Sequence, residues 1–236
     1  MNCKSSPGKS AAALAIVAAL SGAAAAAPVS GSYQGTIERD NGLGLLGMTM
    51  VVDFTYDDST APGDVYENIS TAMFYNHITS MVVTIGANQW TFDAGAGMSF
   101  AEVVNSDVII VSGGIEDRFN HGAFTFNGPD LTAEHAEPQS YSLDIYLSDR
   151  EPVGAPDALD DYMALPSSLP AAELFEGDGQ NLMQFSFYTG DAELGSYYFI
   201  ETGVLSSVSP VPLPAAFWLL AGGLAGTGLL RRRQRA

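Results

Sequence analysis

Residues 48–60, with the sequence MTMVVDFTYDDST, decide the fold class of this chain. Apolar and aromatic residues occupy every second position: Met48, Met50, Val52, Phe54 and Tyr56. Successive side chains of a β-strand point to opposite sides, so a period of two places these residues on one face of a strand. Asp57 and Asp58 then end the pattern with side chains that favour turns. This stretch predicts a half-buried strand followed by a turn.

Stretches of the same kind recur along the chain, separated by Gly, Asn, Asp and Pro. They make about nine expected strands in all, at residues 31–38, 48–56, 77–86, 88–95, 107–114, 122–130, 141–149, 182–190 and 196–207. The short break at residues 86–88 predicts a hairpin. Only residues 158–163 and 170–177 indicate short helical turns. Regularly spaced strands without long helices predict one all-β domain over residues 28–210, an antiparallel β-sandwich of jelly-roll-like form.

Charge is concentrated in that domain. Six of the nine basic residues lie in residues 1–27 and 211–236, and all 27 acidic residues lie between these segments. Residues 28–210 therefore contain only Arg39, Arg118 and Arg150 as basic residues, and their formal charge is −24. Nucleic acid is excluded as a partner, because binding it requires a basic surface. Two interpretations of the acidity stay open, a solvated acidic surface and specific cation binding.

The N-terminal segment, residues 1–27, predicts a secretory signal peptide. Lys4 and Lys9 precede an apolar run at residues 11–20, and small residues follow at 21–27. The run is too short to span a bilayer, and a positive start with an A-x-A exit is typical of a cleaved leader. An uncleaved anchor is the alternative. The one cysteine, Cys3, lies in this leader, so no disulfide or thiol chemistry is expected after it.

The C-terminal segment, residues 211–236, predicts one transmembrane helix with a stop-transfer signal. Residues 213–230 give 18 positions without a charge, roughly 27 Å of helix, which is enough for a marginal span. The arginines that follow are expected to stay in the cytoplasm: Arg231, Arg232, Arg233 and Arg235. Pro212 and Pro214 hold the preceding backbone extended just outside the membrane.

The order of these three parts resembles a known sorting signal. The sequence VPLPA, a glycine-rich helix and an arginine cluster are similar to the VPLPA variant of the PEP-CTERM signals of exported Gram-negative proteins. The resemblance implies an exosortase-type membrane protease as partner and removal of the tail after export. It also implies the recognition residues: Val211, Pro212, Leu213, Pro214 and Ala215. A permanent single-span anchor is the alternative.

Residues 28–210 contain no recognised catalytic motif, cofactor motif or metal motif. The three histidines, His77, His121 and His135, lie in strand-entry, turn and acidic segments, and we expect surface or loop positions for them. Two acidic groups are conceivable calcium ligands without EF-hand spacing, namely Asp57, Asp58, Ser59 and Asp64, and Asp157, Asp160 and Asp161. Trp90 lies on an alternating strand and is expected in the core rather than exposed for sugar stacking.

The sequence therefore predicts a non-enzymatic exported protein of unknown molecular activity. It is expected as an inner-membrane-anchored precursor and then at the cell surface or in the extracellular matrix, with extracellular polysaccharide. The alternatives are a carbohydrate-binding module, with or without calcium, and a polysaccharide hydrolase with an unrecognised acidic site.

Overall fold

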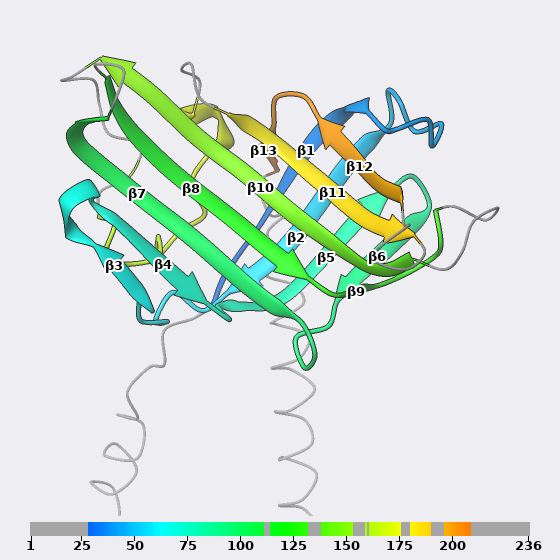
Figure 1. Cartoon of the computed structure of the whole chain (residues 1–236), viewed down its shortest axis with the longest axis horizontal. Helices are drawn as coiled ribbons and strands as arrows, with labels where there is room; N and C mark the ends of the chain where they lie inside the picture. The colour runs from blue at the N-terminus through cyan, green and yellow to red at the C-terminus, as the bar shows by residue number, and fades with distance from the viewer. Residues whose placement is uncertain are drawn as a thin grey trace, which may run out of the picture.

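The computed structural model describes residues 28–110, 114–131, 138–152, 159, 161–175, 180–189 and 196–208. These residues form one continuous, antiparallel sheet that folds over so that its two halves face each other (Figure 1). The prediction of an antiparallel all-β fold is confirmed. The predicted signal peptide and the C-terminal sorting segment lie outside the described residues.

The front half of the sheet, called the front leaf, lies nearest the viewer in Figure 1. In spatial order its strands are β3 (Asp64–Tyr66), β4 (Thr71–Tyr75), β7 (Met98–Ile110), β8 (Gly114–Phe124), β10 (Pro138–Pro152), β11 (Asn181–Thr189) and β12 (Ser196–Thr202). Most neighbours in this leaf follow one another in sequence, as hairpin connections require.

The other half, called the back leaf, lies behind it. Its strands are β13 (Ser206–Val208), β1 (Val29–Arg39), β2 (Thr49–Tyr56), β5 (Ile78–Ile85), β6 (Asn88–Phe92) and β9 (Phe126–Asn127). Two short strands, β3 and β4, lie outside the nine stretches that the sequence predicts, and they pair with each other and with β7. The predicted strand at 107–114 covers only the end of β7 and the start of β8, so most of these two long strands was not predicted. The short strands β9 and β13 fall within the predicted stretch 122–130 and at the end of the stretch 196–207.

Strand β1 joins the two leaves. Its first part pairs with β2, where Tyr33 lies opposite Val52. Its last part pairs with β12, where Ile37 lies opposite Thr202, and the register shifts at this point. Such a shift bends a strand, and the bend here allows one strand to belong to both halves.

The core lies between the leaves and is rich in aromatic rings. Tyr56 of β2 packs 6.3 Å from Phe119 of β8, and Trp90 of β6 packs 5.3 Å from Phe185 of β11, between ring centroids. Trp90 is fully buried, as predicted, and its indole N–H donates to the carbonyl of Pro129 at 2.9 Å. Burial of rings of this size is a main source of stability in such a fold.

The predicted hairpin at residues 86–88 and the predicted helical turn at residues 170–177 are both confirmed. Gly86 and Ala87 form the two-residue turn between β5 and β6, and Gly86 has a φ of 59°, which glycine adopts without a steric penalty. A short 3₁₀ helix, η2 (Ala172–Leu174), lies within the predicted helical turn at 170–177. A second one, η1 (Glu67–Ile69), links β3 to β4.

Candidate functional site

The outward side of the front leaf carries a mixed aromatic and polar surface. On β10, residues 141, 143, 145 and 147 are buried, whereas residues 142, 144 and 146 are half-buried on the opposite side. We call the resulting surface the outer face; it comprises Met98, Phe100, Phe124, Ser142, Asp144, Tyr146, Gln184, Ser186, Tyr188, Tyr197 and Phe199. No described segment crosses in front of these strands in Figure 1, so none of the described residues covers the surface.

The first aromatic cluster lies on β7 and β8. The rings of Phe100 and Phe124 stack with centroids 6.0 Å apart and an interplanar angle of 26°. Phe100 lies over the backbone of Gly122, where a Cβ atom would come within 2.1 Å of the ring. Glycine at this position therefore lets the aromatic ring lie flat on the sheet.

The second aromatic cluster lies on β11 and β12. Tyr188 and Tyr197 have ring centroids 4.9 Å apart, and Phe199 lies 6.1 Å from Tyr197. Tyr188 and Tyr197 are 57% and 43% exposed, so their rings are available to a ligand. The guanidinium of Arg39 lies 5.9 Å from the Phe199 ring and closes this end of the cluster.

A polar band separates the two clusters. The hydroxyl oxygens of Ser142 and Ser186 lie 2.8 Å apart, and Gln184 donates from Nε2 to the hydroxyl of Tyr197 at 3.0 Å. Strand register places Phe124, Ser142, Ser186 and Phe199 in one row across β8, β10, β11 and β12. Three strand spacings give a row about 14 Å long. The face thus alternates aromatic, polar and aromatic over a length greater than one sugar ring.

Asp144 lies in the middle of this band. It stands opposite Gly122 on β8 and Gln184 on β11. Removal from water raises the pKa of its carboxyl group to about 6, and no hydrogen bond to its carboxylate is found among the described residues. An unpartnered, partly desolvated carboxylate retains the capacity to accept hydrogen bonds from a ligand.

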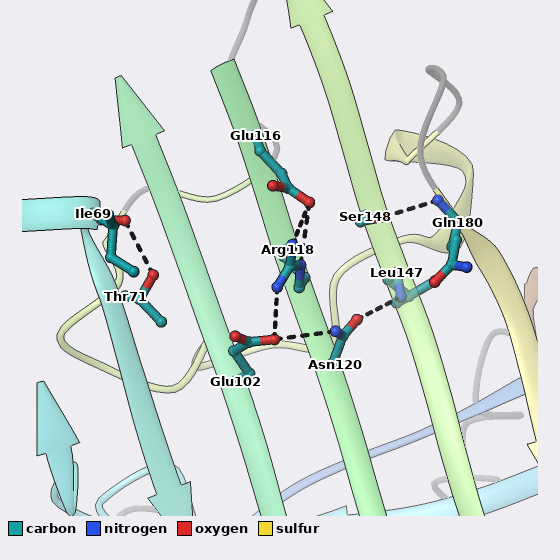
Figure 2. A network of polar contacts seen from close by, with 9 residues as sticks. All are labelled: Ile69, Thr71, Glu102, Glu116, Arg118, Asn120, Leu147, Ser148 and Gln180. Atoms are coloured by element: carbon teal, nitrogen blue, oxygen red, sulfur yellow. Dashed lines mark hydrogen bonds and ion pairs between the residues drawn. The ribbon is translucent and has the colours of Figure 1, made fainter. Parts of the chain in front are cut away.

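Beside this surface, charged side chains on β7 and β8 form the network drawn in Figure 2. The guanidinium of Arg118 bridges Glu102 at 2.9 Å and Glu116 at 2.5 Å, and Asn120 donates to Glu102 at 3.3 Å. The Asn120 side chain also accepts a hydrogen bond from the backbone N–H of Leu147 on β10 at 3.2 Å. These contacts link β7, β8 and β10. The guanidinium of Arg118 is thus already paired with two carboxylates.

His77 and His121 are not at the surface, contrary to the expectation from sequence. His121 lies within β8 rather than at a turn, and both side chains are buried between the leaves. Nε2 of His77 lies 2.8 Å from Nδ1 of His121, a hydrogen-bonding distance. The sequence could not reveal this pair. His77 lies in the short segment between β4 and β5, and it contacts His121 only when β8 packs against that segment. His135 lies outside the described residues.

The predicted calcium ligands do not come together where the structure describes them. The Asp57 carboxylate accepts hydrogen bonds from the backbone and hydroxyl of Ser59, whereas Asp64 accepts one from the Tyr75 hydroxyl. Within the described part of the chain, no three acidic, histidine or cysteine side chains form a group that fits a metal ion. Asp157 and Asp160 lie outside that part, and Asp161 accepts a hydrogen bond from the backbone of Met163.

The predicted sorting residues, 211–215, and the arginines at 231–233 and 235 lie outside the described residues. Among the residues that are described, no helix is long and apolar enough to cross a membrane.

The outer face was not predicted from the sequence. Its signal is the occurrence of consecutive aromatic residues, Phe187-Tyr188 on β11 and residues 197–199 on β12. Consecutive residues of a strand lie on opposite sides, so such runs place rings both in the core and on the surface. Comparison with known protein families, curated proteins and solved structures gives no match to this chain.

Proposed function

We propose that this chain is a non-enzymatic exported protein of the cell surface or extracellular matrix that binds extracellular polysaccharide through the outer face of its front leaf. The observation that carries the proposal is the row in which two aromatic clusters flank a band of hydroxyl, amide and carboxylate groups. Trp90, which is buried in the core as predicted, takes no part in this surface.

The chemistry of a pyranose ring fits such a row. One side of the ring presents C–H groups that pack on an aromatic side chain, while its hydroxyls both donate and accept hydrogen bonds. Tyrosine contributes a large apolar area together with a polar hydroxyl. Ser142, Gln184 and Asp144 supply the hydrogen-bond partners that orient the hydroxyls. An open face suits a polymer, because a long chain can extend past both ends of the row.

The proposal also covers the fold type, export and sorting of the chain. Jelly-roll-like sandwiches include many lectin domains, so such a fold is compatible with sugar binding. Support for export comes from the leader-like residues 1–27. Support for sorting by an exosortase-type protease comes from the order of VPLPA, helix and arginines at residues 211–236. An inner-membrane-anchored precursor and release to the surface or matrix of a Gram-negative bacterium follow from these two signals.

Calorimetric titration with neutral and amine-bearing oligosaccharides tests the binding function. The full-length chain is used in a detergent without a sugar headgroup, which would compete for the face. Tyr188→Ala combined with Tyr197→Ala is expected to weaken binding at least roughly tenfold, since each removed ring takes away one stacking surface. Tyr66→Ala is the matched control, because Tyr66 is 48% exposed but lies on the edge strand β3, outside both clusters. Equal affinities of the double variant and the control would contradict the proposal.

A further inference from the structure

Asp144 combines two properties that no other described aspartate shows together: it lies on the outer face, and no hydrogen bond to its carboxylate is found among the described residues. Asp53 and Asp58 also lack such a bond but lie on β2 of the back leaf and in the turn after it, whereas the carboxylates of Asp40, Asp57, Asp64, Asp93 and Asp161 accept hydrogen bonds from nearby backbone or hydroxyl groups. Asp144 lies in the middle of the proposed binding face without such a donor among the described residues. Its partner is therefore to be sought in a ligand.

The surroundings of Asp144 favour a cation as that partner. A partly desolvated carboxylate is stabilised most by a positive charge that also donates hydrogen bonds. Tyr146 lies near it, since burial and the charge of Asp144 both act to raise the pKa of Tyr146. Aromatic rings next to a carboxylate attract a cation further through their π-faces.

The described residues of this region offer no unpaired cation to the carboxylates of an acidic polysaccharide. Arg39 pairs with Glu201 at 3.0 Å, and Arg118 bridges Glu102 and Glu116. Both described guanidinium groups are thus already paired with carboxylates. The formal charge of −24 over residues 28–210 adds a field that repels polyanions at low salt.

We propose that the polysaccharide bound by the outer face is built of hexoses with free amino groups, and that Asp144 pairs with one sugar ammonium. This inference rests on the proposed function and specifies its ligand. The sugar rings pack on the two aromatic clusters, the ammonium pairs with Asp144, and the sugar hydroxyls reach Ser142 and Gln184. Neither an acidic nor a fully acetylated polymer offers a cation to Asp144.

Titration of the full-length chain with three oligosaccharides of equal length tests the inference: glucosamine, N-acetylglucosamine and uronic-acid oligomers. Glucosamine oligomers are expected to bind at least roughly tenfold more tightly than the acetylated ones, the range of a hydrogen bond to a charged group. Asp144→Asn is expected to remove that difference while leaving weak binding of both. Asp53→Asn is the matched control, since it removes the same charge from an exposed position on β2 of the back leaf. Far-ultraviolet circular dichroism of both variants verifies their folding.

The outcomes separate the inference from the proposed function. Equal binding of acetylated and amine-bearing oligomers, still lost in the double tyrosine variant, overturns the amine preference and leaves polysaccharide binding intact. Equal losses in Asp144→Asn and Asp53→Asn, with binding abolished by salt, show diffuse attraction to an acidic surface and overturn the inference. Binding of none of the oligomers contradicts the proposed function itself.

Discussion

His77 and His121 form a hydrogen-bonded pair in the middle of the core, with Nε2 of His77 2.8 Å from Nδ1 of His121. The rings are surrounded by aromatic side chains, and Phe119 packs edge-on against His121 with centroids 4.1 Å apart. The remaining ring nitrogens, Nδ1 of His77 and Nε2 of His121, have no hydrogen-bond partner in the described structure. Both imidazoles are therefore held in their neutral form by the environment of the core.

The histidine pair predicts a loss of stability in mild acid. Burial lowers the pKa of His77 to about 4, and burial together with the nearby His77 lowers that of His121 well below its usual value. Between pH 6.5 and 4 the unfolded chain binds protons that the folded chain does not, so acidification favours unfolding. His77 alone contributes a loss of about 3 kcal/mol over this range. Urea unfolding at pH 7, 5.5 and 4.5 measures the effect.

A double variant, His77→Leu with His121→Phe, is the control for this prediction. Its free energy of unfolding is expected to depend less on pH in the same range. Asp144 has the opposite effect on the free energy of unfolding in this range. Its raised pKa means that the folded chain binds a proton at a higher pH than the unfolded chain does, so acidification favours the folded state at this residue. The lowered pKa values of Asp40 and Asp57 affect stability only as the pH falls below their ordinary value, 3.8. An unchanged pH dependence in the double variant would show that the pair does not set acid stability.

Gly122→Ala is expected to damage the binding face more than the fold. The added Cβ would meet the Phe100 ring at 2.1 Å, so the ring must leave its place over the strand and its stack on Phe124. Phe100 is half-buried at the surface and has room to turn outward, so a stability loss of about 1 kcal/mol is expected. Oligosaccharide affinity should fall severalfold. Gly95→Ala is the control, because its Cβ would meet only the Asp93 carboxylate at 3.4 Å.

The two arginines whose side chains the structure describes, Arg39 and Arg118, are expected to differ in their contribution to stability. Arg118 bridges two carboxylates and is 27% exposed, whereas Arg39 pairs with Glu201 and is 65% exposed. Arg118→Gln leaves the nearly buried Glu116 without this ion pair and is expected to cost about 1–3 kcal/mol. Arg39→Gln is expected to cost less than about 1 kcal/mol. Equal unfolding free energies of the two variants would contradict the structural role assigned to Arg118.

The C-terminal tail is predicted to be cut, with residues 212–215 deciding the reaction. Replacing Pro212 and Pro214 with alanine removes the restraint that keeps the backbone extended, so the precursor should accumulate in the membrane. Replacing Arg231, Arg232 and Arg233 with glutamine should instead loosen orientation and leave part of the precursor uncut. A blot for a C-terminal epitope, with and without an exosortase-type protein, measures both. An epitope retained on the wild-type chain in both strains would identify a permanent anchor.

Strands such as β2 were predictable from sequence because period and burial agree within them, whereas most of β7 and β8, which carry polar residues such as Glu102 and Arg118, was not predicted. On β2, Met50, Val52, Phe54 and Tyr56 are all buried, as the alternation of residues 48–56 predicts. Met48 is the exception at 36% exposure, since it precedes the strand and lies close to Gly86 at the β5–β6 turn. Local patterns thus identify strands and turns but lose precision at their ends.

Contacts between distant strands were not predictable in this way. The bend of β1 between two partners, the His77–His121 pair and the outer face all depend on register between strands far apart in sequence. A histidine in a polar stretch such as FNHGAF shows no sign of burial until the opposite leaf covers it. Aromatic residues on the outer face likewise look like core residues until alternation places them on the other side.

A crystal structure of the chain with a glucosamine hexamer tests the binding proposal most directly. We expect sugar rings along the outer face, over Phe100 and Phe124 at one end and Tyr188 and Tyr197 at the other, with one amino group at hydrogen-bonding distance from Asp144. An oligosaccharide ordered on the back leaf, or an outer face left empty at saturating ligand, would contradict it.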